Sequence, residues 1–308
     1  MEMGFVKPSY PNENRVALLP ENIKNCFGQV IVEKDFGVSL GISDAEYENS
    51  GAIVLKRQEI FERCDFIYSL KLLQPCDYDL LRDEQVIIGW SHPTGSGSDF
   101  FNTICQQRKI RIVDVDSQFP RIYYLEQVKD LPIIPKGFIN ANSRLAGFSS
   151  VQHALMSHGL VLDCSQKVAL LSVGNVAQGA LDFLLKFSPQ LDIFTRSNMN
   201  DFIKKINQYD IIVNGVEIDT GHIINNNDKM RIKKGALVID AAADGDGAIQ
   251  GTKYTTIENP IYVEDGVYYY VVNNSPSLLY REASLLISNS FTENIYSKSP
   301  EEFIRFLN

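Results

Sequence analysis

Histidine, tryptophan and cysteine are scarce in this sequence of 308 residues, which holds four histidines, one tryptophan and five cysteines. The cysteines stand far apart, without a C-x-x-C pair and without histidines at ligand spacing: Cys26, Cys64, Cys76, Cys105 and Cys164. A metal site and a catalytic thiol are therefore disfavoured, because both need closely patterned partners. We predict free thiols, mostly buried, and no bound metal.

Long apolar runs and basic clusters are also missing. The net charge is −9, the calculated pI is about 5.0, and the lysines and arginines are scattered along the chain. No stretch reaches membrane-spanning length without charges, and the first residues, MEMGFVKPSY, lack the basic start and apolar core of a signal peptide. We therefore expect an acidic cytoplasmic protein of about two domains that binds neither nucleic acid nor membrane.

Short apolar runs alternate with helical patterns along the whole chain. Strands are expected at 4–6, 30–32, 53–55, 66–70, 86–90, 110–113, 168–173, 191–195, 211–213 and 237–239, a hairpin at 260–264 and 267–272, and helices at 144–158, 278–290 and 301–306. This alternation predicts an α/β fold of two Rossmann-like lobes with parallel sheets flanking a cleft. We expect a substrate and catalytic domain at 1–140, a nucleotide-binding domain at 141–275, and C-terminal helices at 276–308 that pack back on the first domain.

The stretch 167–200 carries the most informative pattern. Its apolar run ends at Gly174, Gly179 follows, and no bulky residue stands where a helix would begin, so the backbone could approach a pyrophosphate. The next strand ends in Thr195-Arg196-Ser197 instead of the acidic residue that holds a ribose 2′-hydroxyl. A cation and two hydroxyls suit a 2′-phosphate, so the pattern predicts NADP(H). A glycine after a strand can also be only a turn.

Several polar side chains follow predicted strands. Lys71 and His92 end adjacent strands, where they could form an acid/base pair for carbonyl and imine chemistry. Arg15 could hold a substrate carboxylate with two hydrogen bonds. The acidic loop with Asp244 and Asp246 could orient a cofactor or accept a substrate amine. Each also has a simpler interpretation: a solvated lysine, a turn histidine, a surface salt bridge and a polar turn.

Six segments together resemble the alanine dehydrogenase, pyridine-nucleotide transhydrogenase and saccharopine dehydrogenase superfamily: 14–20, Lys71, His92, 174–180, 244–249 and 274–276. The likeness covers nearly the whole chain. Within that superfamily, the short length, the variant glycine loop and the segments 214–217 and 274–284 look most like the N5-(carboxyethyl)ornithine synthase family. The resemblance implies an enzyme that condenses pyruvate with the side-chain amine of ornithine or lysine and reduces the imine with NADPH.

The resemblance also implies roles for single residues. Arg15 and Lys71 would grip the carboxylate and carbonyl of the keto acid, and His92 would be the acid/base group. Asp244 matches the catalytic aspartate of alanine dehydrogenases, but Gly245-Asp246 departs from their pattern, so the choice between Asp244 and Asp246 stays open. The expected cofactor-binding residues are Gly174, Asn175, Val176, Gly179, Thr195, Arg196, Ser197, Asn214, Gly215 and Asn274, the last near the nicotinamide.

Three functions remain open from the sequence. One is the reductive condensation by a homo-oligomer such as a tetramer. Another is a saccharopine-type or alanine-type dehydrogenase with a different keto acid or amine, and the third is a non-catalytic NADP-binding protein. Ornithine and lysine differ by one methylene, which an apolar contact discriminates only modestly, so the sequence does not choose the amine.

Overall fold

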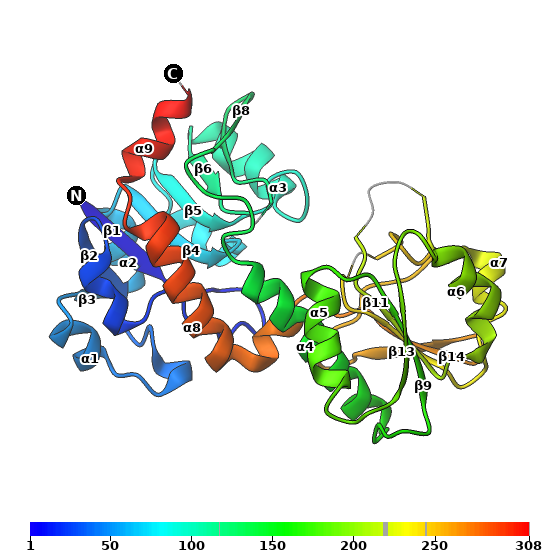
Figure 1. The fold of residues 1–308 in the computed structure, drawn as a ribbon. Coiled ribbons are helices and arrows are strands. Elements are labelled where there is room, and N and C mark those ends of the chain that lie inside the picture. The colour runs from blue at the N-terminus through cyan, green and yellow to red at the C-terminus, as the bar shows by residue number, and fades with distance from the viewer. Residues whose placement is uncertain (117, 218–220, 244, 308) are drawn as a thin grey trace. The chain divides into compact units, whose positions relative to one another are not determined.

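The computed structural model describes residues 1–308 except 117, 218–220, 244 and 308. The chain divides into two compact units (Figure 1). Unit 1 comprises residues 1–139 and 280–308, and unit 2 comprises residues 140–279. None of the helices among the described residues combines the length and the apolar character that crossing a membrane requires.

The sheet of unit 1 is built around its first strand. Its strands lie in the order β3 (Ile53–Leu55), β2 (Gln29–Glu33), β1 (Glu2–Val6), β4 (Phe66–Lys71), β5 (Val86–Trp90), β6 (Arg111–Asp114), β7 (Arg121–Tyr124) and β8 (Gln127–Asp130). The six from β3 to β6 run parallel. The chain leaves β1 toward β2 on one side and returns to β4 on the other. The loops after β1 and β4 therefore diverge at a topological switch point, where open α/β sheets gather their ligand-binding groups.

Short helices surround this sheet. They are η1 (Pro20–Asn25), η2 (Val38–Leu40), α1 (Asp44–Asn49), α2 (Arg57–Arg63), η3 (Pro75–Leu80), α3 (Ser98–Phe100), η4 (Phe101–Cys105), α8 (Tyr280–Phe291), η7 (Thr292–Tyr296), α9 (Pro300–Ile304) and η8 (Arg305–Leu307). The C-terminal segment from α8 onward belongs to unit 1, although it follows unit 2 in the sequence. Unit 1 is therefore built from both ends of the chain.

The edge hairpin β7 and β8 is absent from the sequence prediction. Both strands have only four residues, and all of β8 is exposed, so neither shows the apolar alternation of a half-buried strand. The turn between them places Leu125 at a φ of 50°, where glycine or asparagine is the usual signal. β7 pairs antiparallel with β6, and β8 pairs antiparallel with β7, so the sheet is mixed rather than wholly parallel.

Unit 2 holds the second sheet, with the strand order β10 (Gln190–Phe194), β9 (Lys167–Leu171), β11 (Ile211–Asn214), β12 (Leu237–Asp240), β14 (Val267–Tyr270) and β13 (Ile261–Glu264). The predicted hairpin is confirmed: β13 runs antiparallel to β14, and Asp265 and Gly266 between them both have positive φ. The other neighbours are parallel. Both sheets confirm the two-lobed α/β prediction, with antiparallel strands at the edges.

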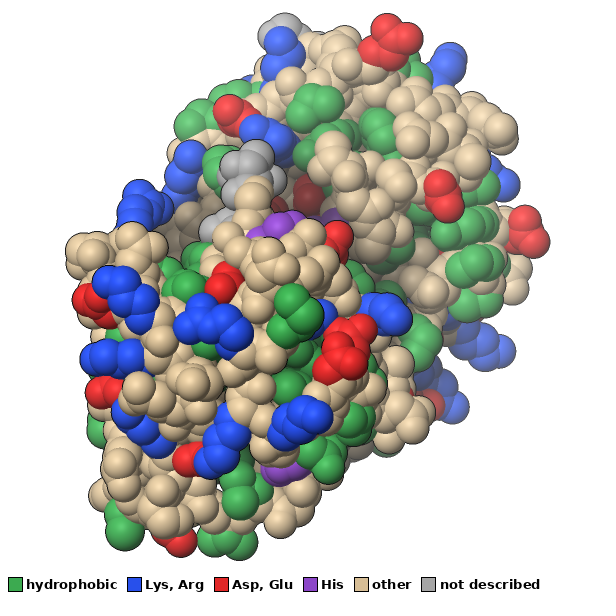
Figure 2. Space-filling model, turned by 90° about the vertical axis from the view of Figure 1, so that its right-hand side faces the viewer, with side chains coloured by type: hydrophobic (Ala, Val, Ile, Leu, Met, Phe, Trp, Pro, Cys, Tyr) green, Lys and Arg blue, Asp and Glu red, His purple; other side chains and the backbone are tan. Residues whose placement is uncertain are grey.

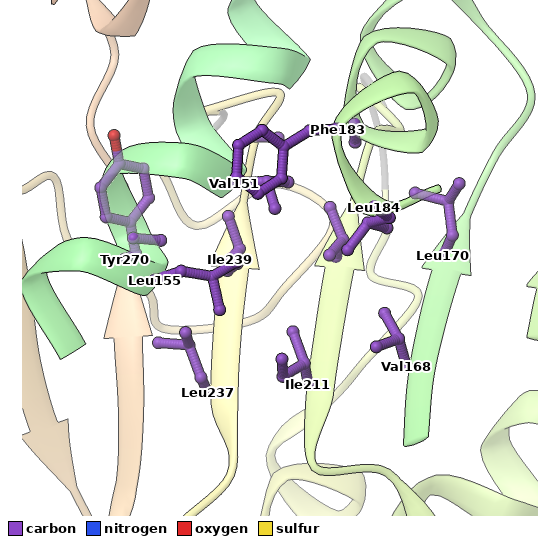
Figure 3. Packing of buried hydrophobic residues seen from close by; sticks show 14 of the residues in the cluster. Val151, Leu155, Val168, Leu170, Phe183, Leu184, Ile211, Leu237, Ile239 and Tyr270 are labelled. Carbon is purple, nitrogen blue, oxygen red and sulfur yellow. The ribbon is translucent and has the colours of Figure 1, made fainter. Parts of the chain in front are cut away.

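Two layers of helices bury the two faces of this sheet. The helices are α4 (Asn140–His158), α5 (Asn175–Leu184), α6 (Met199–Lys205), η5 (Ile206–Gln208), α7 (Asn226–Lys229) and η6 (Ser275–Leu279). On one face, Val151 of α4 and Leu184 of α5 pack on Leu170 of β9 and Ile239 of β12 (Figure 3). The alternate strand residues form a second core on the other face with Phe202 of α6. This period of two is why the central strands read as continuous apolar runs.

The helices α4 and α5 touch through glycines. A Cβ on Gly179 would lie 1.6 Å from the carbonyl oxygen of Arg144, and a Cβ on Gly147 would lie 1.8 Å from that of Val176. Gly179 is the fifth residue of α5 and is buried. The structure therefore gives Gly179 a role in helix packing, which corrects the expectation that it lines a pyrophosphate.

The five cysteines are free among the described residues. Cys64 and Cys105 are buried and Cys26 is half-buried, but Cys76 and Cys164 are exposed. The expectation that most thiols are buried is thus wrong for these last two. Burial raises the pKa of the Cys26 and Cys105 thiols to about 12, which leaves both protonated and unreactive at neutral pH.

Candidate functional site

Arg15 lies in the loop after β1 and is only 2% exposed. Its Nε and Nη2 donate to the two carboxylate oxygens of Glu13 at 2.7 and 2.5 Å. Burial alone would raise the pKa of Glu13, but the hydrogen bonds and charge of Arg15 and the charge of Lys71 hold it below its usual value. Arg15 is therefore a buried cation oriented by an ionised carboxylate, and not a surface salt bridge.

The loop that carries Arg15 is fixed by the C-terminal helix of the same unit. The backbone amides of Val16 and Leu19 donate to the hydroxyls of Ser284 and Ser288, both in α8, at 2.8 Å. In the same loop, the backbone carbonyl of Leu18 accepts a hydrogen bond from the hydroxyl of Tyr47 at 2.9 Å. A loop held by buried hydrogen bonds places the guanidinium with little conformational freedom, which is what a binding group needs.

Lys71, the last residue of β4, is brought next to Arg15. The ammonium of Lys71 lies 5.4 Å from the ring centroid of Trp90, and the guanidinium carbon of Arg15 lies 5.6 Å from the same centroid. The ring centroid of Tyr10 is 5.8 Å from the same ammonium. Lys71 makes no ion pair within the described part of the chain. Sequence reasoning assigned no role to Glu13, Tyr10 or Trp90, because nothing local marks a residue that meets its partners only in the fold.

The setting of Lys71 makes its proton easy to remove. Burial, and then the charge of Arg15, lower the pKa of Lys71 from 10.5 to about 8, against the opposing charge of Glu13. A lysine with a pKa near 8 can hold an anion when protonated and exchange a proton near neutral pH. The simpler interpretation of a solvated loop lysine is wrong, since the side chain is mostly buried.

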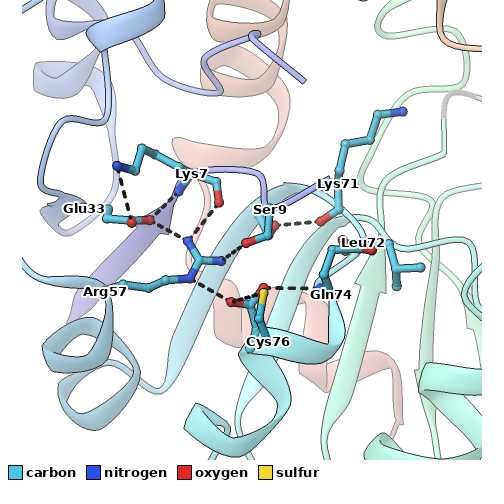
Figure 4. A network of polar contacts seen from close by, with 10 residues as sticks. Lys7, Ser9, Glu33, Arg57, Lys71, Leu72, Gln74 and Cys76 are labelled. Carbon is cyan, nitrogen blue, oxygen red and sulfur yellow. Dashed lines mark hydrogen bonds and ion pairs between the residues drawn. The ribbon is translucent and has the colours of Figure 1, made fainter. Parts of the chain in front are cut away.

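A polar network supports the same loop from the other side (Figure 4). The guanidinium of Arg57 donates to Glu33 at 2.6 Å, to Asp77 at 2.8 Å, to the carbonyl of Lys7 at 2.9 Å and to the hydroxyl of Ser9 at 2.8 Å. It thereby ties the start of the loop after β1 to β2 and η3. The Lys71 side chain points away from this network (Figure 4). Its ammonium lies over the Trp90 ring instead.

His92 lies in the loop after β5, two residues beyond Trp90. Its φ is 45°, and the amides of Ser91 and His92 donate to the Asp114 carboxylate at 3.0 and 3.3 Å. Burial raises the pKa of Asp114, while the charge of His92 and these amides oppose that rise. Within the described residues no direct contact joins the side chains of His92 and Lys71. The structure thus brings Arg15 and Lys71 together and places His92 on the neighbouring strand end.

A separate pocket lies in unit 2, at the carboxyl ends of β9, β10 and β11. It has a volume of about 300 Å³ and is lined by Ser172, Val173, Thr195, Arg196, Met199, Val216, Glu217 and Ile223. Such a crevice beside a strand–helix turn is where Rossmann folds hold the adenosine half of a dinucleotide.

The face drawn in Figure 2 carries lysines and arginines interspersed with acidic side chains rather than a field of one sign.

The loop after β10 presents two of the three expected polar residues, Thr195 and Arg196, to this pocket. Arg196 is exposed and, among the described residues, takes part in no ion pair. The Thr195 amide donates to Oδ1 of Asn198 at 2.6 Å, and the Thr195 and Ser197 hydroxyls are 2.9 Å apart. Asn198, which sequence reasoning overlooked, therefore holds the loop in shape. The residues fit a 2′-phosphorylated nucleotide, since at the end of β10 the lining offers the cation of Arg196 and the hydroxyl of Thr195.

The remaining expected residues have mixed placements. Asn214 is fully buried, and its side-chain amide donates to Val216 O and to Asp240 Oδ1, each at 2.9 Å. These bonds hold the loop after β11 in place. A Cβ on Gly215 would lie 2.9 Å from the Ala177 amide, so this glycine allows β11 to approach α5. The Asp246 carboxylate accepts from the Gly251 amide at 2.6 Å inside its own turn. Asn274 is 9% exposed, next to η6. Asp244 lies outside the described residues.

The structure also revises the register of the glycine pattern. Gly174 caps the start of α5, whose first residues are Asn175 and Val176. Two residues before it, Ser172 has a φ of 99°, and three residues after it, Ala177 is buried against Gly215. The G-x-G-x-x-G/A fingerprint is thus present with a serine first. Reading serine as a substitute for the first glycine would have found it from the sequence.

Comparison with known proteins identifies the family. The model of the alanine dehydrogenase/PNT N-terminal domain matches residues 4–119, and that of the C-terminal domain matches residues 123–305. The N(5)-(carboxyethyl)ornithine synthase of Clostridium botulinum strain Hall is 45% identical over 99% of this chain and 96% of its own length. The protein of the same name from Lactococcus lactis subsp. lactis is 43% identical over 99% and 97%.

Solved structures show the same fold. An L-alanine dehydrogenase superposes with a TM-score of 0.80 at 18% identity, over 96% of this chain and 89% of its own. A transhydrogenase from Sinorhizobium meliloti gives a TM-score of 0.75 at 17% identity, over 94% and 91%. Together with the family models, these dehydrogenase-type relatives support a pyridine nucleotide cofactor. By the family models and by the relatives 43–45% identical over nearly its full length, this chain belongs to the N(5)-(carboxyethyl)ornithine synthase family of enzymes, within the alanine dehydrogenase/PNT family.

Proposed function

We propose that this chain catalyses the NADPH-dependent reductive condensation of pyruvate with the side-chain amine of ornithine. The names of its relatives supply the reaction, and one observation on this chain carries it: the cations of Lys71 and Arg15 lie within 6 Å of the same Trp90 ring in a mostly buried setting. Their mutual repulsion contributes to the lowered pKa of Lys71, and a bound carboxylate would relieve it. A small keto acid is the substrate class that suits this arrangement.

The residues of unit 1 then have separate tasks. Arg15, oriented by Glu13, binds the pyruvate carboxylate, and protonated Lys71 polarises the carbonyl oxygen. The deprotonated amine attacks the carbonyl carbon, so the C–N bond forms as the C=O π bond breaks; the oxygen takes a proton from Lys71, and the nitrogen releases one to His92, which gives the carbinolamine. His92 or Lys71 donates a further proton as water leaves the carbinolamine to give the imine. When bound, NADPH supplies the hydride that reduces the imine carbon.

The choice of NADPH depends on Arg196. Replacing Arg196 with Ala should weaken NADPH binding about tenfold to a hundredfold, because the guanidinium would lose a charge-assisted hydrogen bond to the 2′-phosphate. NADH binding should stay nearly unchanged. Fluorescence titration of both nucleotides measures this. Lys204→Ala, on the exposed face of α6, is a matched loss of positive charge that should affect neither nucleotide. Equal losses for NADPH and NADH in Arg196→Ala would contradict a 2′-phosphate contact.

The reaction itself is tested by following NADPH absorbance with pyruvate and a panel of amines, with mass analysis of the product. We expect consumption with ornithine and a product that carries a carboxyethyl group on the side-chain nitrogen. A faster reaction with lysine would change the amine and keep the reaction class. Turnover with ammonia alone would identify an alanine dehydrogenase instead, and no turnover with any amine would refute the proposal. The homo-oligomer, such as a tetramer, and the cytoplasmic location stay predictions.

A further inference from the structure

Ser172 adopts a backbone conformation that serine rarely takes. Its φ of 99° lies in the left-handed region, where any Cβ is strained and glycine is not. The dinucleotide fingerprint places glycine at this first position to make the tight turn. A glycine at this position would adopt the same backbone conformation without strain. The presence of a serine therefore points to a task for its side chain.

Two hydrogen bonds define where the Ser172 hydroxyl stands. The Ser172 amide donates to the carbonyl of Phe194 at 2.7 Å, which fixes the residue beside the end of β10. The Ser172 Oγ accepts from the Gly174 amide at 3.0 Å. Gly174 caps the N-terminus of α5, so its amide belongs to the turn that approaches a pyrophosphate in this fold. The hydroxyl therefore occupies a donor that the fingerprint offers to the cofactor.

A serine hydroxyl can accept one hydrogen bond and still donate another. The structure records no acceptor for the Ser172 hydroxyl proton among the described residues. Ser172 also lines the nucleotide pocket of about 300 Å³ together with Thr195 and Arg196. The Ser172 hydroxyl is therefore a donor with its proton available, and it faces a cavity suited to a phosphorylated nucleotide.

We propose that the Ser172 hydroxyl donates a hydrogen bond to the pyrophosphate of the bound nucleotide, relayed from the Gly174 amide. The amide polarises the hydroxyl by donating to its oxygen, and the hydroxyl donates in turn to a phosphate oxygen. The Ser172 side chain thus makes the contact to the phosphate that a backbone amide makes in the usual fingerprint. This inference rests on the proposed function, since it adds a contact to the same nucleotide site.

The test compares Ser172→Ala with Ser172→Gly by fluorescence titration of NADPH and NADH. The alanine keeps the strained Cβ and removes the hydroxyl, so both nucleotides should bind about tenfold or more weakly, since both carry the pyrophosphate. Both variants free the Gly174 amide, but only the glycine also removes the Cβ, so only there can the phosphate approach that amide closely. The affinities of the glycine variant should return to within about threefold of the unaltered protein. Thermal unfolding of both variants confirms that they are folded.

Ser165→Ala is the matched control, because Ser165 is exposed just before the other end of β9. Its affinities should not change. Affinities within twofold of the unaltered protein for Ser172→Ala would overturn the proposal, and so would a loss confined to NADPH, which would place the hydroxyl at the 2′-phosphate. Equal losses in the alanine and glycine variants would still support the hydroxyl as donor. An unaltered protein that binds neither nucleotide would refute the proposed function itself, which is a distinct result.

Discussion

Replacing His92 with Asn should lower turnover about 10²-fold to 10⁴-fold while leaving NADPH affinity unchanged. Imidazole is the side chain that most often serves as a general acid or base, and losing such a group typically costs that much. Asparagine is the better replacement than alanine, because the backbone here has a φ of 45° and asparagine tolerates the left-handed region. Steady-state kinetics and nucleotide titration on the same preparation separate chemistry from binding.

His158→Asn provides the matched control. His158 is the last residue of α4 in unit 2, where its ring packs 4.5 Å from that of Tyr268, so the change should leave turnover within about twofold. If His92→Asn also kept turnover within about fivefold, His92 would have no part in the proton transfers. Lys71 would then be the remaining candidate for that role in unit 1.

Replacing Lys71 with Met should reduce kcat/KM for pyruvate about 10²-fold or more and should make the protein more stable at pH 7. The activity falls because the charged hydrogen bond to the substrate is lost. The stability rises because burial and Arg15 disfavour the ammonium, lowering its pKa from 10.5 to about 8. Each pKa unit is worth about 1.4 kcal/mol, so removing the charge recovers up to about 3 kcal/mol. Lost contacts with Tyr10 and Trp90 reduce this to about 1–2 kcal/mol.

The pH dependence has a definite sign. Between pH 8 and 10.5 the unfolded chain holds the Lys71 proton and the folded chain does not, so this group makes the free energy of unfolding increase with pH. Lys71→Met should lack that increase. For catalysis, the pyruvate KM of the unaltered enzyme should rise as pH passes about 8, because the ammonium that binds the substrate is lost.

Lys71→Arg separates charge from proton transfer. Its guanidinium stays charged, so the rise of the pyruvate KM above pH 8 should disappear. A KM that rises equally in Lys71→Arg and in the unaltered enzyme would assign the pH dependence to another group. Denaturant unfolding at pH 7 gives the stability comparison, and a Lys71→Met variant less stable than the unaltered protein would contradict the lowered pKa.

The sequence by itself determined the class of fold and the position of the strand–turn–helix unit that we propose to bind the nucleotide. Apolar runs at 168–173, 211–213 and 237–239 predicted central strands because a sheet covered on both faces needs uninterrupted apolar residues. The hairpin at Asp265-Gly266 was predictable because the turn chemistry is local. The edge strand β8 was not, since four exposed residues bury too little to leave a pattern.

Only the tertiary structure decided which of the candidate residues meet. Arg15 and Lys71 are 56 positions apart in sequence, and they meet at Trp90 because β1, β4 and β5 are neighbours in the sheet. Gly179, which reads as part of a phosphate loop, packs α5 against α4 because its missing Cβ leaves room for a carbonyl. Burial and long-range contacts set the pKa of a lysine and the role of a glycine, and neither is encoded within a few residues of the position itself.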